Sequence, residues 1–154
     1  MGKEIERKFL VTSDAYKTQG KGSYYRQSYL CNTVEKVVRV RIADHKGYLT
    51  LKGANNGITR LEFEYEIPVA EAQQMLDAFC TKPDIEKTRY RIPFEGYVWE
   101  VDEFMGENEG LVVAEIELPS EDATFVKPDW VGVEVSDDDR YYNSNLIRNP
   151  FSKW

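Results

Sequence analysis

Polar and apolar residues alternate along most of this chain with a period of two, which is typical of β-strands. In Arg60–Glu66 every charge falls on one side and Leu, Phe and Tyr on the other, because successive strand side chains point to opposite faces. The short connections favour antiparallel neighbours, since parallel strands need long crossovers. The pattern predicts strands, rich in β-branched and aromatic residues, at Lys3–Val11, Tyr24–Leu30, Val37–Ile42, Tyr48–Lys52, Ile58–Pro68, Ile85–Ile92, Tyr97–Phe104 and Val112–Leu118.

Three stretches depart from this alternation and predict helices. Ala70–Phe79 carries an apolar stripe at helical spacing, as expected of a surface helix. Ser120, followed by two acidic residues, has the N-cap signature of a short helix that runs toward Val126. A third helix is expected near Arg140–Ile147, directly after three aspartates.

About eight antiparallel strands with few helices are typical of a barrel or a sandwich, within a mainly β (α+β) class. Periodicity alone leaves both architectures open. In a sandwich the charged faces would point outward, whereas a barrel can enclose a polar interior and cover its apolar outer face with helices. No repeat, low-complexity tract or linker divides the sequence, so we expect residues 1–154 to form a single domain.

Composition excludes several classes of protein. With 154 residues and 42% hydrophobic residues, the chain can bury a core and is not intrinsically disordered. It has no signal segment and no apolar run near the roughly 20 residues that span a bilayer, so we expect a cytoplasmic protein without membrane binding. Cys31 and Cys80 are then expected to be reduced thiols. His45 is the only histidine and no CxxC pair exists, which argues against a zinc site.

The net charge of −7 argues against nonspecific nucleic-acid binding, which needs a basic surface. Net charge does not fix where the charges lie. Those in phase on one face of the strands are Glu4, Glu6, Lys8, Arg39, Arg41, Lys52, Arg60, Glu62, Glu64, Glu66, Lys87, Arg89, Arg91, Glu100, Asp102, Glu115 and Glu117. The opposite faces are bulky and apolar. The charged face must therefore meet either bulk water or an enclosed, wet cavity.

The charges gather by sign along individual strands. Carboxylates recur as Glu-x-Glu, an arrangement that costs stability unless a cation lies between them, and basic residues recur as Arg-x-Arg and Lys-x-Arg-x-Arg. A solvated face with cross-strand ion pairs, each worth about 0.2–1 kcal/mol, is the simpler alternative. Segregated sets of both signs suit a divalent metal beside a polyphosphate. No Walker loop is present, so side chains would have to hold the phosphates.

The segment Glu4-Ile5-Glu6-Arg7-Lys8 resembles the N-terminal Glu-x-Glu-x-Lys signature of the CYTH superfamily, the triphosphate tunnel metalloenzymes. The resemblance continues in family order through Arg39-Val40-Arg41, Thr50-Leu51-Lys52, Arg60-Leu61-Glu62-Phe63-Glu64, Lys87-Thr88-Arg89, the strand of Asp102, and Glu115-Ile116-Glu117. It is most similar to the short bacterial members that act as inorganic triphosphatases. The resemblance implies a single eight-stranded antiparallel β-barrel that forms a tunnel with a charged interior, helices outside and a C-terminal helix that closes it.

The resemblance also implies roles for individual residues. The basic positions that hold the triphosphate correspond to Lys8, Arg39, Arg41, Lys52, Lys87 and Arg89, with Arg60 close to them and Arg140 on the C-terminal helix. The positions that bind one or two Mg²⁺ or Mn²⁺ ions correspond to Glu4, Glu6, Glu62, Glu64, Asp102, Glu115 and Glu117. Glu66, Arg91 and Glu100 lie nearer to strand ends, and we interpret them as ordinary ion pairs. Tyr29 fits either a hydrogen bond inside the tunnel or core packing.

We therefore expect an enzyme that hydrolyses the terminal phosphoanhydride bond of a linear triphosphate, inorganic tripolyphosphate first, by metal-activated water. Glu4, Glu6 and Lys8 are the expected catalytic residues. A class IV adenylate cyclase, a nucleoside or thiamine triphosphatase, and a noncatalytic polyphosphate-binding module are the alternatives. The last would tolerate loss of the carboxylates, so the presence of both charge sets favours catalysis. We expect a small-molecule triphosphate as partner, no nucleic acid, and a monomer or weak homodimer.

Overall fold

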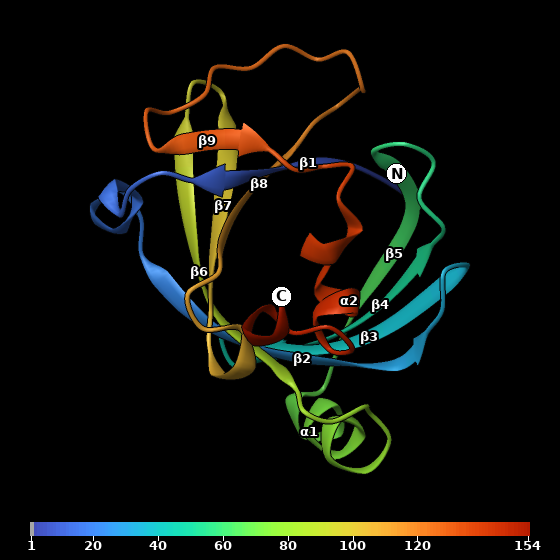
Figure 1. Cartoon of the computed structure of the whole chain (residues 1–154). Helices are drawn as coiled ribbons and strands as arrows, with labels where there is room; N and C mark the ends of the chain where they lie inside the picture. Colours follow the sequence, from blue (N-terminus) through green and yellow to red (C-terminus); the bar gives the residue numbers. More distant parts are fainter. Residues whose placement is uncertain (1) are drawn as a thin grey trace.

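The computed structural model describes residues 2–154, in which eight antiparallel strands close into a barrel (Figure 1). Around the barrel the strands follow the order β5-β4-β3-β2-β6-β7-β8-β1, and β1 pairs back onto β5. The predicted barrel is thus confirmed. The strands are β1 (Lys3–Val11), β2 (Gly22–Asn32), β3 (Lys36–Ala43), β4 (Lys46–Gly53), β5 (Thr59–Ile67), β6 (Ile85–Phe94), β7 (Tyr97–Phe104) and β8 (Val112–Glu117).

The seam between β1 and β5 is the narrowest in the barrel. Only three residue pairs are in register there, whereas every other neighbouring pair around the ring shares five to eight. A ninth strand, β9 (Val131–Glu134), pairs with the outer edge of β1 and was not predicted. It has only four residues, which are too few for a period of two to stand out.

One predicted helix is confirmed and two differ from expectation. The helix α1 (Val69–Ala78) packs Ala72 and Leu76 against Val40 on the outside of the barrel. The helix predicted after Ser120 is wrong, because the Ser120 hydroxyl donates to Asp122 rather than capping a helix, and the chain runs on in extended form.

The predicted C-terminal helix is split by an extended residue. A 3-10 turn at η3 (Asp139–Tyr141) is followed by the single-turn helix α2 (Asn143–Leu146). Tyr142, between the two, has a ψ angle of 130°, which no helix tolerates. Further 3-10 turns are η1 (Ala15–Thr18), η2 (Gly106–Asn108) and η4 (Phe151–Lys153).

The largest apolar core lies outside the barrel wall. Trp99 is fully buried, with its ring 5.5 Å from Phe9 and 6.2 Å from Trp130, all centroid to centroid. Tyr16 of η1 and Phe125 complete this cluster. The segment after β8 therefore covers the outer face of β1, β6, β7 and β8. This covering layer allows the strands to bury their apolar side outward.

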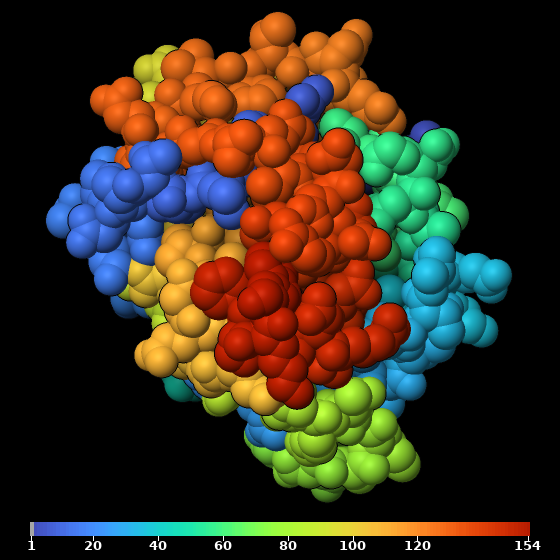
Figure 2. Space-filling view, in the orientation of Figure 1, coloured from blue at the N-terminus to red at the C-terminus, as the bar shows by residue number. Residues whose placement is uncertain are grey.

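A second apolar cluster closes one end of the barrel from within. Ile85, Phe104 and Val113 point inward, in phase with the charged side chains of their strands, and pack against Tyr141 and Leu146. The C-terminal segment, red in both views, lies across this end (Figures 1 and 2). The charged interior thus has an apolar floor. The structure bears out the expectation that the C-terminal segment closes the tunnel, although not as one helix.

The helices of the described chain are short. None of them in residues 2–154 is long and apolar enough to cross a membrane. Cys31 and Cys80 are both free thiols, and Cys80 is buried beside α1. Packing and hydrogen bonds, without a disulfide between these two residues, hold the described fold together.

Trp99→Ala tests the importance of the outer core. Removing a fully buried tryptophan is expected to lower the free energy of unfolding by about 3–5 kcal/mol, because lost apolar burial and a residual cavity add together. The measurement is urea denaturation followed by circular dichroism. Val34→Ala, at a side chain that is 89% exposed, is the control and should change stability by less than about 0.5 kcal/mol. Equal effects of the two substitutions would contradict the assignment of this core.

Candidate active site in the barrel interior

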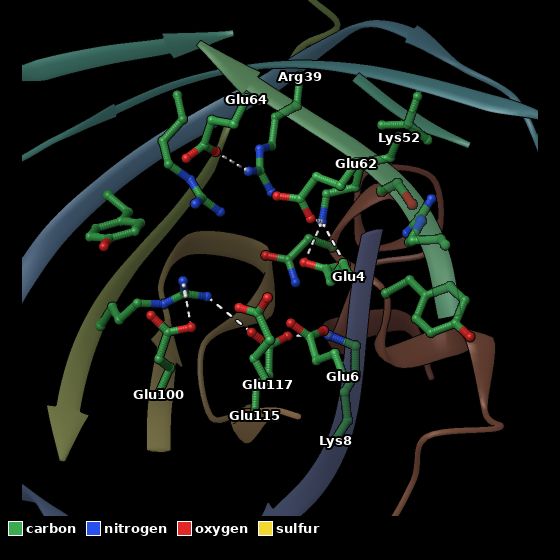
Figure 3. A pocket seen from close by; sticks show the side chains of 18 of the residues that line it. Glu4, Glu6, Lys8, Arg39, Lys52, Glu62, Glu64, Glu100, Glu115 and Glu117 are labelled. Atoms are coloured by element: carbon green, nitrogen blue, oxygen red, sulfur yellow. Dashed lines mark hydrogen bonds and ion pairs between the residues drawn. The ribbon is translucent and has the colours of Figure 1, made fainter. Parts of the chain in front are cut away.

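The charged faces of the strands point inward and line a cavity of about 370 Å³ (Figure 3). All the candidate site residues named from the sequence line it except Asp102 and Arg140. Arg91 and Glu100, interpreted above as ordinary pairs, also line the cavity, while Glu66 does not. The alternation along the strands therefore identifies the inner face. Arg91 and Glu100 also pair with each other, as interpreted from the sequence.

Five buried charges of alternating sign form a continuous chain across four strands. Lys8 of β1 pairs with Glu115 of β8, whose Oε1 accepts from Arg89 Nη2 of β6 at 3.1 Å. Arg89 Nε donates to Asp102 Oδ1 of β7 at 2.7 Å, and Lys87 Nζ donates to Asp102 Oδ2 at the same distance. None of the five residues is more than 8% exposed. We call this set the five-charge chain.

Pairing keeps Asp102, Glu115 and Lys8 of the five-charge chain ionised, whereas burial lowers the pKa of Lys87 to about 7. Burial alone would raise the pKa of Asp102, but Arg89 and Lys87 outweigh it and lower that pKa to about 2. Glu115 is likewise buried, yet Lys8 and Arg89 hold its pKa well below the usual range. Burial would lower the pKa of Lys8, but Glu115 and Glu6 raise it. Both carboxylates are therefore occupied by protein cations.

A second group of carboxylates converges on the cavity with too few cations. Glu6 of β1 lies directly opposite Glu117 of β8 in the antiparallel register. Lys52 Nζ lies 3.3 Å from Glu4 Oε1 and 3.6 Å from Glu62 Oε2, and Lys8 Nζ lies 3.1 Å from Glu6 Oε1. Glu62 Oε2 is buried without a hydrogen-bond partner. Figure 3 shows these four carboxylates directed toward a common space. We call Glu4, Glu6, Glu62 and Glu117 the acidic quartet.

Burial and mutual repulsion raise the pKa of several carboxyls in the acidic quartet. For Glu6, burial and the charge of Glu115 raise the pKa to about 7. For Glu4, burial raises it, Lys52 partly opposes this, and Glu62 adds to it. The pKa of Glu117 is raised by burial, then by Glu4 and Glu6. An added cation would relieve this repulsion. Within residues 2–154, no three acidic, histidine or cysteine side chains are yet arranged to hold a metal ion.

Two arginines in the cavity have no carboxylate partner among residues 2–154. Arg41 Nε donates to Gln27 Oε1 at 2.8 Å, and the Nε and Nη2 of Arg60 donate to the Gly53 carbonyl at 3.1 and 3.0 Å. Burial, reinforced by Arg39 and Arg89, lowers the pKa of Arg41 to about 10. A bound anion would reverse that destabilisation. Arg41 is therefore an unsatisfied positive charge inside the barrel.

Arg39 has one carboxylate partner and also one buried donor without a partner in the described chain. Its Nη2 donates to Thr50 Oγ1 at 3.2 Å and to Glu64 Oε2 at 3.3 Å. Its Nε is buried and has no hydrogen-bond partner in the described chain. The side chain is 7% exposed, so an unsatisfied donor there is costly unless a ligand supplies an acceptor.

Arg140 lies outside the cavity. It pairs with Asp138 at 2.7 Å, its guanidinium lies 4.7 Å from the centroid of the Trp154 ring, and its side chain is half exposed. The structure brings instead Tyr142 and Asn143 of the C-terminal segment to the cavity wall. No local pattern pointed to these two residues, because the path of this segment depends on the apolar floor.

Uncharged inner-face residues of β2 also escaped the charge-based search. Tyr25 and Tyr29 line the cavity, and the Tyr29 hydroxyl accepts from Gln27 Nε2 at 3.4 Å. Of the two alternatives for Tyr29, the structure therefore shows the hydrogen bond inside the tunnel. The period-two pattern of β2 carries enough information to place these residues inward. Tyr29 was considered from the sequence, whereas Tyr25 was not singled out because it carries no charge.

A closed β-barrel that buries opposed sets of cations and carboxylates defines a class of tunnel-shaped proteins for small polyanionic ligands. Residues 2–144 match the family model described as the CYTH domain, and the chain belongs to this family. An inorganic triphosphatase of Acetivibrio thermocellus is 61% identical over 154 residues, covering 100% of this chain and 99% of the relative. An inorganic triphosphatase of Nitrosomonas europaea is 36% identical over 152 residues, covering 93% and 95%.

Solved structures share the same architecture. The crystal structure of an inorganic triphosphatase matches with a TM-score of 0.67 and 34% identity, covering 94% of this chain and 93% of that one. A protein from Pyrococcus horikoshii matches with a TM-score of 0.61 over 77% of this chain and 80% of its own. At 19% identity, the second match shows the fold alone.

Asp102→Asn tests whether the five-charge chain is structural. Removing this charge leaves Lys87 and Arg89 buried with one partner fewer, and it is expected to destabilise the fold by about 3–5 kcal/mol. Asp138→Asn removes the same charge from the exposed pair with Arg140 and should cost at most about 1 kcal/mol. Urea denaturation of both variants makes the comparison. A small effect at Asp102 would show that the barrel does not depend on the chain.

Proposed function

We propose that this protein is an inorganic triphosphatase that converts a linear triphosphate and water into pyrophosphate and phosphate. The observation that carries the proposal is the cavity itself, in which a carboxylate-free arginine lies beside a cation-poor acidic quartet. Inorganic tripolyphosphate is the first substrate to consider, because the relatives from Acetivibrio thermocellus and Nitrosomonas europaea are both inorganic triphosphatases. A cavity of about 370 Å³ also fits a small molecule rather than a polymer.

The acidic quartet fits a divalent cation. It offers hard carboxylate oxygens, a buried oxygen of Glu62 without a partner, and facing glutamates at Glu6 and Glu117 that repel one another. Mg²⁺ and Mn²⁺ prefer such oxygen ligands, and we propose one or two of these ions as the cofactor. When bound, such an ion supplies charge neutralisation at phosphate oxygens and activation of water.

The other candidate ligands have different contacts. Both oxygens of Glu115 and both oxygens of Asp102 already accept from Lys8, Arg89 or Lys87. Glu64 Oε2 accepts from Thr50 at 2.8 Å. We therefore assign these three carboxylates to holding the basic side chains. Lys8, expected above to be catalytic, contacts Glu6 and Glu115, and we propose that it keeps these two carboxylates in place.

Basic side chains bind and orient the phosphates in this proposal. Arg41 and Arg60 have terminal nitrogens that no carboxylate occupies, and Arg39 has a free Nε. Arginine donors suit phosphate oxygens in geometry and charge. They also neutralise the charge that grows on the leaving pyrophosphate as the bond breaks, at no reorganisation cost because the barrel fixes them beforehand. Lys52, Lys87 and Arg89 complete the positive wall.

Several finer expectations from the sequence stay predictions. The cytoplasmic location, the lack of nucleic-acid binding and the monomeric or weakly dimeric state belong to this group. A substrate panel of tripolyphosphate, ATP, thiamine triphosphate and pyrophosphate, each with Mg²⁺ and with Mn²⁺, separates the triphosphatase from a nucleotide-specific enzyme. Release of pyrophosphate together with a cyclic nucleotide from ATP would reveal cyclase activity instead.

Phosphate release from tripolyphosphate tests the reaction. We expect the wild-type protein to be active with Mg²⁺ or Mn²⁺, and a Glu4→Gln/Glu6→Gln variant to lose at least about 100-fold in kcat, as when charged groups in an active site are neutralised. Glu66→Gln is the matched control, because Glu66 lies in phase on β5 but outside the cavity. No phosphate release with either metal would overturn the proposed function.

Metal binding is measured separately from activity. Titration of the protein with Mn²⁺, followed by electron paramagnetic resonance of the free ion, is expected to show binding that weakens about 10-fold or more in Glu6→Gln/Glu117→Gln, because two oxygen-rich charged ligands are lost. Glu66→Gln should bind as the wild type does. Equal Mn²⁺ affinity in all three proteins would place the cation away from the acidic quartet.

A further inference from the structure

Strand β2 separates the two strands that carry most of the cavity's arginines and lysines. It pairs with β3, which bears Arg39 and Arg41, and with β6, which bears Lys87 and Arg89. The inner face of β2 itself is uncharged. In register, Gln27 lies opposite Arg41 and Tyr25 lies opposite Lys87. Neutral side chains therefore stand between two rows of positive charge.

The ring of Tyr25 contacts two guanidinium groups. The Arg41 Cζ atom is 5.0 Å from the ring centroid, and the Arg89 Cζ atom is 5.1 Å from it. Both distances fall within the range of cation–π attraction, which is stronger when the pair is removed from water. Tyr25 is 8% exposed. The ring thus attracts both arginines, which offsets part of the repulsion between their like charges.

Gln27 fixes Arg41 from a second direction. It is fully buried, and its Oε1 accepts from Arg41 Nε at 2.8 Å. Its Nε2 lies within hydrogen-bond distance of Asn143 Oδ1, at 3.3 Å, and of the Tyr29 hydroxyl, at 3.4 Å. These contacts use the Nε of Arg41 and leave its two terminal nitrogens free of protein carboxylates. A neutral amide, rather than an acid, orients this arginine.

Arg89 shows the contrast within the same cavity. Its guanidinium contacts carboxylate oxygens of Asp102, Glu100 and Glu115. A phosphate that binds Arg89 must share or displace those partners. A phosphate that binds Arg41 meets a charge that no carboxylate has compensated. The two arginines touch the same tyrosine ring but differ in how much of their charge a ligand can use.

We propose that Tyr25 and Gln27 are positioning residues that hold Arg41 with neutral groups, so that its charge is available to one phosphate of the substrate. The inference rests on the proposed function, since it names the determinant of triphosphate binding in that same cavity. Neutral groups that orient Arg41 without neutralising its charge preorganise the site. Preorganisation favours binding because it lowers the cost of ordering and desolvation.

Gln27→Glu provides the sharpest test, because it keeps the shape of the side chain and gives Arg41 a carboxylate. We expect the metal-free protein, in EDTA, to bind tripolyphosphate about 10-fold or more weakly than the wild type in isothermal titration calorimetry. Under turnover conditions the KM should rise while kcat changes less. If Gln27 only held Arg41 in place, tripolyphosphate affinity would not fall, because the new ion pair would hold Arg41 at least as firmly. Unchanged affinity would overturn the proposal.

Tyr25 supplies an independent pair of variants. Tyr25→Phe keeps the aromatic face and should bind tripolyphosphate as the wild type does, whereas Tyr25→Leu has no such face and should bind it several-fold more weakly. If Gln27→Glu does not fold, this pair decides the matter. Equal affinity of the Phe and Leu variants would contradict the role of the ring. A loss in Tyr25→Phe equal to that in Tyr25→Leu would assign the effect to the hydroxyl and also overturn the proposal.

A double-mutant cycle shows whether both residues act through Arg41. In an Arg41→Gln background, Tyr25→Leu and Gln27→Glu should have little further effect on tripolyphosphate affinity, measured at low ionic strength. Additive losses would show that they act elsewhere. Binding in EDTA does not require turnover. A protein that shows the expected affinities without hydrolysis would refute the triphosphatase and leave the positioning role, whereas hydrolysis with unchanged affinities would do the reverse.

Discussion

The burial of five charges of alternating sign is the constraint on which the rest of the structure depends. Moving an ion out of water costs several kcal/mol, and only well-placed partners compensate for it. In the five-charge chain, Lys8 is the register partner of Glu115 and Arg89 is the register partner of Asp102. A slip of one residue in any of these strands would turn its charges toward the apolar outer layer. The chain therefore favours one register, and that register places the acidic quartet and Arg41 around one cavity.

A charged interior also determines where the apolar side chains go. Because the inside of the barrel is polar, Trp99 and its neighbours pack on the outside, beneath the segment that follows β8. The apolar floor under Tyr141 and Leu146 is the exception, and it lies at one end. The segment after β8 and the C-terminal segment follow the apolar surfaces that they cover. Packing against those surfaces therefore determines their short turns more than local propensity does.

The sequence predicted the fold wherever its information was local and periodic. The period of two placed Glu6, Lys8 and Arg41 on the inner face, and the family resemblance showed that this face is enclosed. Where contacts between strands decide the outcome, the prediction stopped. Nothing in the Asp102 strand shows that its carboxylate is occupied by Lys87 and Arg89 rather than turned toward the cavity.

The same limit explains the remaining differences. An N-cap signature at Ser120 competed with packing of Phe125 against Phe9 and Trp99, and packing prevailed. Arg140 was assigned by resemblance, but in the structure Asp138 and Trp154 hold it on the surface. Tyr25 and Gln27 show the reverse case. Their inward direction was readable from the strands, but a search weighted toward charge did not single them out.

The barrel is a sheet rolled so that its first strand, β1, pairs with β5, and this closing seam has only three residue pairs in register. Fewer residue pairs are in register between these two strands than between any other neighbours around the ring. Glu4 and Arg60 face each other across this seam, and both line the cavity. The buried ion pairs of the five-charge chain lie instead among β1, β8, β6 and β7. The fold thus combines a wall that buried ion pairs connect with a seam of few backbone pairs, and residues of both line the cavity.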